Sequence, residues 1–405
     1  MKSKVTTVIS EGYREYQLHS AFQPIISIPH RRSVGYEGLI RAYTDEGKPC
    51  SPLDLFMLPK SSDEHLELDR TCRRLHIENF SKQSTTNEWL FINLDSQCLA
   101  EEKPTPGFMD SLFSLHNISP QRVVIEILES EINDRDYLKS LISHFRSMGC
   151  LIAIDDFGAG HSNFERIWEL EPDIVKLDRR LVQRAANNSK VKRILSGMVS
   201  LIHETGSLVI IEGVETEQEA AVAIAVNADM VQGFYFARPN AIIQQQNEKM
   251  DSAISRLIQL QLEQGEEKSH SFNHHFLCFK KLFKDTVHDF NHLSQFDLCA
   301  QAIFSEPRAV RCFLLDEAGN QIGDSIHSAA CQQLDERFAP LLSGDHANWS
   351  HKHYHHRAIS APGRLQMTRP YLSIAGSHMC ITVSKAVDIN GQLLVFCCDL
   401  NWTDE

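Results

Sequence analysis

The sequence predicts an α/β protein whose larger, N-terminal part is a closed (β/α)8 barrel. Short apolar runs alternate with segments of helical periodicity, which is typical of a parallel sheet covered by helices. The runs fit into about 220 residues, a length that suits a compact barrel. The eight candidate strands are residues 21–28, 34–41, 89–95, 122–128, 150–155, 173–177, 207–212 and 229–234. Helical segments between them include residues 64–82 and 190–205.

Acidic residues or an asparagine close several of these apolar runs. They are Glu37, Asn93, Glu126, Asp155, Asp156 and Glu212. In a (β/α)8 barrel the strand ends meet at one mouth, where active sites lie. Five carboxylates and one amide converging there would repel one another unless a divalent cation neutralised them. An oxygen-only ligand set favours Mg²⁺ or Mn²⁺ over structural zinc. The pattern therefore predicts a metal-dependent enzyme.

The composition limits the classes of protein to which this chain could belong. A chain of 405 residues is long enough for a barrel and a smaller module, and its 42% apolar and 23% charged residues are typical of soluble globular proteins. The net charge of −13 argues against a surface for nucleic-acid polymers or anionic membranes. No apolar stretch approaches the ~20 residues that cross a bilayer, and the first residues lack the apolar core of a signal peptide. We therefore expect a cytoplasmic protein without membrane insertion.

The 11 cysteines are scattered along the chain and form no CxxC pair. This spacing argues against a disulfide framework or a zinc ribbon. We expect most of them to be reduced, buried and small hydrophobic side chains.

A series of short motifs, in a fixed order, points to a known family. The motifs are Glu37-Gly38-Leu39-Ile40-Arg41, Asn93, Glu126-Ile127-Leu128-Glu129-Ser130, Asp155-Asp156-Phe157-Gly158-Ala159-Gly160, Val175-Lys176-Leu177-Asp178, Glu212-Gly213-Val214-Glu215-Thr216 and Gln232-Gly233-Phe234 to Pro239. Together they resemble the EAL family of cyclic di-GMP phosphodiesterases over the whole predicted barrel. The resemblance implies a (β/α)8 barrel with one antiparallel strand and hydrolysis of cyclic di-GMP to linear pGpG.

The resemblance also implies roles for individual residues of this chain. The first metal would be held by Glu37, Asn93, Glu126 and Asp155. Asp155 would bridge to a second metal, with Asp156 beside it. Catalytic roles fall to Lys176 (orienting the attacking water), Glu212 (general base), Gln232 (holding the metal-bound water network) and Glu129 (fixing the Asp155-Asp156 loop). We expect one or two Mg²⁺ or Mn²⁺ ions per barrel and Ca²⁺ as an inhibitor. Two ions about 3.5–4 Å apart would stabilise both attacking and leaving oxygens of an in-line displacement.

Substrate contacts follow from the same resemblance. Gln23 would contact a guanine, Arg41 a phosphate, and Glu215, Phe236 and Pro239 the second guanine. From the residue types alone, Phe236 could equally be a core aromatic, and Arg41 could pair with a surface carboxylate. Asn93 could be a turn residue and Lys176 a surface lysine.

Two positions depart from the usual motifs. Gly38 replaces the alanine of the family's name-giving motif, which keeps a small residue but loosens the strand slightly. Leu128 stands where threonine is commoner, which leaves Glu129 to anchor its loop without that hydroxyl.

The C-terminal part predicts a separate α+β domain. Residues 240–264 are expected to form a helix, the polar run 261–271 a linker that interrupts it, and residues 272–293 a second helix. Runs at 379–387 and 392–400, joined by Asp388-Ile389-Asn390-Gly391, predict a β-hairpin. The predicted organisation is a barrel (1–240), a linker helix (241–271) and a sensor domain (272–405).

Several residues of this C-terminal part resemble a PAS/CACHE-type sensor fold, and with the barrel they resemble two-domain proteins of the YkuI type. They are Tyr354, Arg357, Pro362-Gly363, Thr368, Pro370-Tyr371, Ser384, Gly391 and Asp399. The domain is expected to bind a small molecule or to serve only for dimerisation, and a homodimer is expected. The histidines crowded at 351–356 and 270–275 predict solvated, partly charged loops in preference to a metal site.

The first functional hypothesis is a metal-dependent cyclic di-GMP phosphodiesterase regulated by its C-terminal domain, with activity that is low or conditional. The alternative is a cyclic di-GMP receptor that turns the nucleotide over weakly or not at all and signals through partner binding.

Overall fold

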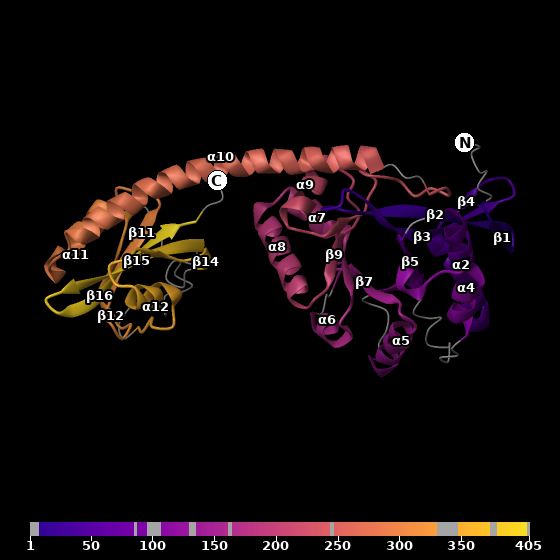
Figure 1. Ribbon diagram of the computed structural model, residues 1–405, viewed down its shortest axis with the longest axis horizontal. Helices are drawn as coiled ribbons and strands as arrows, with labels where there is room; N and C mark the ends of the chain where they lie inside the picture. Colours follow the sequence, from indigo (N-terminus) through magenta and orange to yellow (C-terminus); the bar gives the residue numbers. More distant parts are fainter. Residues whose placement is uncertain are drawn as a thin grey trace. The chain divides into compact units, whose positions relative to one another are not determined.

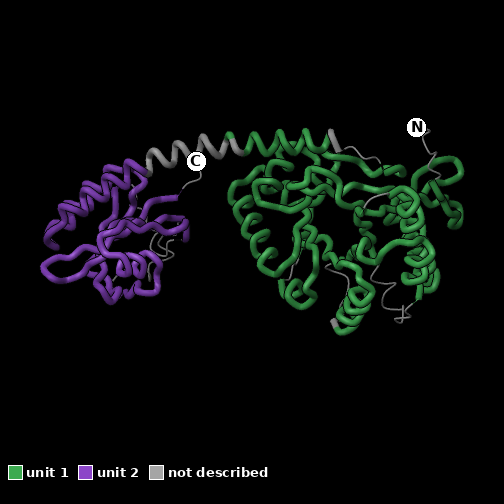
Figure 2. The backbone as a smooth tube through the Cα atoms, viewed as in Figure 1, with its two compact units in different colours: residues 1–265 green, residues 266–405 purple. Residues whose placement is uncertain are grey.

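The computed structural model describes residues 8–84, 87–94, 107–128, 135–160, 164–243, 247–329, 347–372 and 379–402. The chain divides into two compact units, residues 1–265 and 266–405 (Figure 2). Each unit has its own sheet and its own hydrophobic core. Within the described ranges, no helix combines the length and the apolar composition that a membrane span needs.

The first unit is the expected barrel (Figure 1). Its strands follow the order β2-β10-β9-β8-β7-β6-β5-β3, and the pairing of β2 with β3 closes the sheet. β2 is antiparallel to both of its neighbours, whereas the other neighbouring pairs are parallel. The (β/α)8 prediction with one antiparallel strand is therefore confirmed. The strands are β2 (Tyr16–Ser27), β3 (Arg32–Thr44), β5 (Trp89–Leu94), β6 (Val123–Leu128), β7 (Leu151–Phe157), β8 (Ile174–Leu177), β9 (Leu208–Ile211) and β10 (Met230–Val231), with β1 (Ser10–Tyr13) and β4 (Pro49–Cys50) added at the edges.

Helices surround this barrel. They are α1 (Pro52–Phe56), α2 (Ser62–Gln83), α4 (Phe108–His116), α5 (Arg135–Met148), α6 (Phe164–Leu170), α7 (Arg179–Ala186), α8 (Ser189–Glu204) and α9 (Glu217–Ala225). Side-chain caps fix where several begin, because the first backbone N–H groups of a helix lack internal partners. Ser61 accepts from Glu64 N ahead of α2, and Asn188 accepts from Lys190 N ahead of α8. Thr216 and Glu219 form a reciprocal capping box at α9.

An apolar layer fills the barrel interior directly behind the predicted site. It consists of Ile25, Phe91, Val124, Ala153, Ile174, Ile210 and Met230. Alternate residues of a strand face the same side. The residues two positions after Phe91, Val124, Ala153, Ile174, Ile210 and Met230 are Asn93, Glu126, Asp155, Lys176, Glu212 and Gln232. The same alternation that fills the interior therefore places these polar side chains together in the next layer, at the mouth.

The second unit contains an antiparallel sheet of six strands in the order β12-β11-β16-β15-β13, with β14 also paired to β15. The predicted hairpin is present, and Asn390 and Gly391 in its turn both have the positive φ that such a turn requires. The elements are β11 (Ala309–Leu315), β12 (Gln321–His327), β13 (Gln366–Met367), β14 (Tyr371–Leu372), β15 (Met379–Ile389) and β16 (Gln392–Asn401), with α11 (Phe296–Ile303) and α12 (His353–Ser360).

The expected interruption at residues 261–271 is wrong. α10 is one continuous helix, Asn247–His288. The polar run is rich in Gln, Glu and Lys, which are good helix formers, so its polarity does not end the helix. The N-terminal part of α10 contributes Met250, Ile254 and Leu257 to the core of the first unit. Its C-terminal part contributes Phe279, Phe283 and Val287 to the core of the second.

The prediction of a solvated histidine loop at 351–356 is also wrong in part. His353, His355 and His356 lie in α12, and His355 is buried. Its Nε2 is 3.0 Å from the carbonyl oxygen of Asp316, so a backbone group satisfies the buried ring. The side chains of His270, His274 and His275 lie outside the described residues.

A buried charged pair ties together three strands of the second sheet. The guanidinium of Arg311 on β11 donates from Nη2 (2.9 Å) and Nε (3.0 Å) to Oδ2 of Asp399 on β16. Thr382 on β15 donates to Oδ1 of the same carboxylate (2.6 Å). Arg311 also lies over the ring of Phe313, 4.2 Å from its centroid. Because both charges are almost fully buried, neither can be removed without leaving the other uncompensated.

Arg311→Ala is expected to lower the free energy of unfolding of the second unit by about 3–5 kcal/mol, because it leaves Asp399 buried without its cation. Arg308→Ala is the matched control, since Arg308 and Glu306 pair in a half-buried position, with 32% and 15% of their side chains exposed, where loss of the pair is expected to cost less. Urea unfolding of the full chain measures both. Equal, small effects would show that the buried pair contributes no more than the half-buried pair.

Candidate active site

Lys176 lies at the centre of the polar layer at the barrel mouth. It comes from β8 and is 1% exposed. Its Nζ lies 2.5 Å from Glu126 Oε1, 2.5 Å from Glu212 Oε1 and 3.2 Å from Asp155 Oδ1. A fourth carboxylate, Glu37, is 3.8 Å away. One ammonium group therefore faces four carboxylates from four other strands or strand ends.

A chain of amides and carboxylates extends this ring toward β2 and β5. Asn93 Nδ2 donates to Glu37 Oε1 (3.0 Å), and Gln232 Nε2 donates to Glu37 Oε2 (2.6 Å). Gln232 Nε2 also lies 3.2 Å from Gln23 Oε1, and Gln23 Nε2 donates to the carbonyl oxygen of Ala237. These bonds use both carboxylate oxygens of Glu37 and fix it between neighbouring strands.

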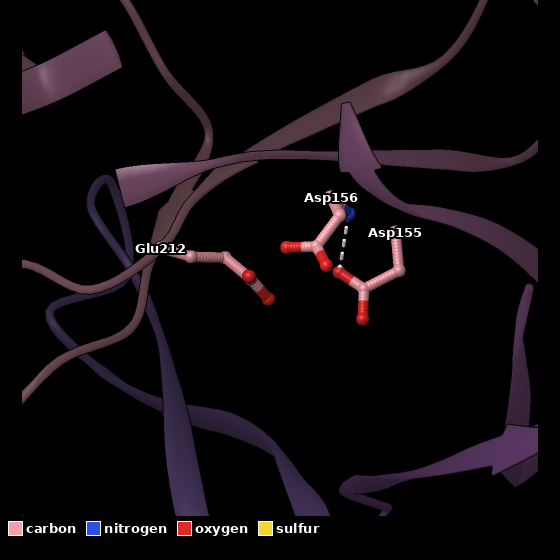
Figure 3. Close-up of side chains that lie close together, drawn as sticks. All are labelled: Asp155, Asp156 and Glu212. Atoms are coloured by element: carbon pink, nitrogen blue, oxygen red, sulfur yellow. Dashed lines mark hydrogen bonds between the residues drawn. The ribbon is translucent and has the colours of Figure 1, made fainter. Parts of the chain in front are cut away.

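Asp155, Asp156 and Glu212 form the third part of the site (Figure 3). One oxygen of each lies within 4.8 Å of the others, a spacing that could hold a metal ion. Asp156 has a left-handed backbone, with φ 56°, which is uncommon for a residue other than glycine. Its backbone N–H donates to Asp155 Oδ1 (2.8 Å). The turn directs both aspartates toward the mouth although they are adjacent in sequence.

The electrostatics of the ring are dominated by burial and by excess negative charge. Burial raises the pKa of Glu126 well above its usual value, and Lys176 offsets this only in part. Burial and the neighbouring Asp155 and Glu37 likewise raise the pKa of Glu212, against the opposing effect of Lys176. Burial alone would lower the pKa of Lys176, but the carboxylates around it outweigh that effect and raise it. Lys176 therefore stays charged, and its single positive charge does not balance the negative charges of the carboxylates around it.

The donor set fits a divalent cation. Among the described residues, Glu126 Oε2 and Gln232 Oε1 are buried and have no hydrogen-bond partner. Buried oxygens of this kind are costly unless a cation or an ordered water satisfies them. The surrounding ligands are carboxylate and amide oxygens, as Mg²⁺ and Mn²⁺ prefer. The ring could therefore hold a cation between Glu37, Asn93, Glu126 and Asp155, with Asp156 and Glu212 on the adjoining side.

The predicted substrate residues lie at different depths. Arg41 is half-buried, and its Nη1 donates to the carbonyl oxygen of Ile40 (2.8 Å). Glu215 is exposed, and its Oε1 lies 3.6 Å from Nη1 of Arg179. Pro239 is half-buried. Phe236 is 7% exposed and belongs to the hydrophobic core, which favours the core interpretation of this residue. Glu129 lies outside the described residues.

Two features near the site were missed from the sequence. Asp69 and Arg73 on α2 form an ion pair in which both side chains are buried, and their i, i+4 spacing was the only signal that could have suggested it. His76, one turn further along α2, packs against Gly38 in the first motif. No motif or periodicity marks this histidine, because the contact depends on how α2 lies on β3.

Comparisons with known proteins agree with this geometry. A profile of the EAL domain matches residues 8–239, more than half of the chain. The chain belongs to the EAL domain family. Among its relatives, the cyclic di-GMP phosphodiesterase RocR of Pseudomonas aeruginosa is 32% identical over 148 residues, covering 36% of this chain and 36% of RocR. The probable cyclic di-GMP phosphodiesterase PdeA of Escherichia coli is 32% identical over 142 residues, covering 35% of this chain and 20% of PdeA. Matches to these two relatives span about a third or less of their lengths.

Solved structures extend the likeness. The Bacillus subtilis YkuI protein, with an EAL domain and in complex with substrate cyclic di-GMP and calcium, matches with a TM-score of 0.77 and 20% identity. The match covers 95% of this chain and 96% of YkuI, so the two proteins share a fold that extends beyond the EAL domain. The manganese and cyclic di-GMP complex of Klebsiella pneumoniae BlrP1 has a TM-score of 0.52 and 26% identity, covering 58% of this chain and 59% of BlrP1. The PAS/CACHE assignment of the second unit remains a prediction.

Mn²⁺ is expected to raise the melting temperature of the EAL domain, because a cation that binds only the folded state stabilises it by mass action. The shift should be larger near about pH 8 than near about pH 5.5. The raised pKa values of Glu126 and Glu212 mean that the metal-free fold loses stability as the pH rises through them. Differential scanning fluorimetry with and without Mn²⁺ measures this.

Glu126→Gln should lose most of the Mn²⁺ shift, since it removes a carboxylate from the centre of the ring. Glu217→Gln is the matched control, because Glu217 pairs with Arg256 in an exposed position on α9. Equal shifts in the two variants would place the cation elsewhere.

Proposed function

We propose that this chain hydrolyses cyclic di-GMP to linear pGpG at the mouth of its EAL barrel. The observation that carries the proposal is the ring of Glu37, Glu126, Asp155 and Glu212 around buried Lys176, within a domain of the EAL family. The names of RocR and PdeA and the contents of the BlrP1 complex support this substrate and a divalent cation. In the proposal, Glu37, Asn93, Glu126 and Asp155 hold one Mg²⁺ or Mn²⁺, and Asp155 with Asp156 holds a second.

Each residue of the ring has a separate role in the proposed reaction. A divalent cation bound there supplies a Lewis acid and lowers the pKa of a bound water. Glu212 accepts the proton of the attacking water, and its place beside Lys176 at the mouth of the barrel suits it to this role. Lys176, 2.5 Å from Glu212, orients that water and remains positively charged. Gln232 holds Glu37 through Nε2 and offers its unpartnered Oε1 to a water.

Substrate contacts are assigned to residues that lie at different depths around the mouth. The guanidinium of Arg41 donates from Nη1 to the carbonyl oxygen of Ile40 on the same strand. We assign its other N–H groups to a phosphate oxygen of the substrate. Gln23 lies beside Gln232 and would reach one guanine. Glu215 and Pro239 would line the second base. Phe236 is omitted from this set, because it is buried in the core.

Glu212→Gln is expected to lower kcat for cyclic di-GMP by about 100- to 10,000-fold, the usual contribution of a positioned general base. Binding of the nucleotide should persist, since the amide keeps the size of the side chain. Chromatographic separation of pGpG after incubation with Mn²⁺ measures the rate, and Glu217→Gln serves as the control. Parental rates in Glu212→Gln would rule out Glu212 as the base. Nucleotide that the parent binds and leaves uncleaved would instead favour the receptor hypothesis.

We further propose that the second unit regulates the barrel, as a homodimer and through a small-molecule ligand. The supporting observation is that α10 contributes apolar side chains to both cores. A helix shared in this way can transmit a shift from one core to the other.

Separating the units should therefore change activity. Residues 1–265 keep the part of α10 that completes the first core, and their kcat/KM is expected to differ from that of the full chain by about 5- to 150-fold, the usual range of allosteric coupling. Steady-state kinetics and light scattering on both proteins measure this. Identical kcat/KM and subunit number would remove the support for regulation and for dimerisation through the second unit.

A further inference from the structure

Gly38, in the first motif, lies directly against His76 of α2. A Cβ atom at residue 38 would be 2.9 Å from Cγ of His76 and 3.2 Å from its Cβ and Cδ2. A separation below 3.0 Å is essentially never seen for a real Cβ, so an alanine here would force the ring or the strand to move. The imidazole therefore occupies the space that the alanine methyl of the usual motif would need.

His76 cannot move away cheaply, because it is buried and held from its other side. It is 4% exposed, and its Nδ1 lies 2.9 Å from the hydroxyl oxygen of Ser20 on β2. Its ring meets that of Phe22 edge-on, with centroids 6.5 Å apart. Phe22 is in turn the register partner of Gly38 in the pairing of β2 with β3. One side chain thus joins α2 to both strands at the level of the first motif.

The position of His76 matters because the residues flanking Gly38 belong to the site. Glu37 immediately precedes Gly38, and Arg41 follows three residues later on the same strand. A cavity of about 200 Å³ opens beside the strand, and its lining includes His76, Gly38, Arg41 and Asn93. Burial, followed by the charge of Arg41, lowers the pKa of His76 to about 3, so the ring is neutral and does not repel the guanidinium. His76 therefore contributes the shape of its ring and one hydrogen bond, with Ser20.

We propose that His76 is a positioning residue for the first motif and that Gly38 is its matched partner. By filling the space beside Gly38, His76 sets where β3 presents Glu37 to the cation and Arg41 to the phosphate. The proposal rests on the proposed function, since it takes the roles of Glu37 and Arg41 from it.

A double-mutant cycle on the full chain tests the match, with Gly38→Ala, His76→Ala and the combined variant. Gly38→Ala should weaken Mn²⁺ binding and raise KM for cyclic di-GMP by about tenfold or more, because displacement of a site by about 1 Å can cost about 100-fold. His76→Ala should show a smaller loss. The combined variant should recover to within about threefold of the parent, since the new methyl takes the space that the imidazole leaves.

Calorimetry measures Mn²⁺ affinity, and steady-state kinetics separates KM from kcat. Gly197→Ala, on a glycine of α8 with open space around it, is the control.

Each outcome decides the proposal. Losses in the combined variant that equal the sum of the single losses would overturn the match. A change in melting temperature alone, with Mn²⁺ affinity and KM unaltered, would make His76 merely structural and overturn its positioning role. If Gly38→Ala does not fold, the proposal requires the combined variant to fold and to bind Mn²⁺ at least as tightly as His76→Ala. A parent that binds Mn²⁺ without hydrolysing the nucleotide would overturn the proposed enzyme, while the Mn²⁺ cycle would still decide the pairing. A parent that binds no Mn²⁺ would overturn the metal assignment and this proposal with it.

Discussion

The imbalance between one buried ammonium and the carboxylates around it constrains the whole mouth of the barrel. Lys176 is in contact with Glu126, Glu212 and Asp155, and all of these groups are largely withdrawn from water. Such a cluster is tolerable because each carboxylate lies beside the ammonium of Lys176 and because the excess negative charge can be met by cations. Burial, with the neighbouring Asp155 and Glu37, raises the pKa of Glu212, and the surrounding carboxylates keep the lysine charged. The burial and crowding that make this cluster costly to fold therefore also determine the protonation of Glu212 and Lys176.

The barrel makes this cluster possible through the simplest property of a strand, its two-residue alternation. The apolar side chains inside the barrel and the polar side chains at its mouth are separated by two residues on strand after strand. The parallel arrangement of seven strands then aligns the polar positions in one layer. β2 runs the other way, yet Gln23 still reaches this layer and bonds to Gln232. The reversed strand thus contributes to the site from the opposite direction along the chain.

Much of this arrangement could be predicted from the sequence, because it depends on local patterns. The apolar runs predicted every barrel strand, and the residues that close them include the four carboxylates around Lys176. The roles of Lys176 and Gln232 were expected only from the family resemblance. Contacts that depend on how elements pack could not be predicted. The fit of His76 against Gly38 requires the position of α2 on β3, and the buried Arg311–Asp399 pair requires the register of β11 and β16. The polar run in α10 predicted a linker, which is wrong because polarity alone does not distinguish a helix from a linker.

Anomalous diffraction from crystals of the full chain grown with Mn²⁺ and cyclic di-GMP would locate the cations on which this scheme depends. We expect one or two manganese peaks in contact with Glu126 and Asp155, with Lys176 still beside Glu212. Manganese bound only outside the ring, with the contacts of Lys176 to Glu126 and Asp155 unchanged, would show that the lysine alone balances the carboxylates and would contradict the metal-dependent site.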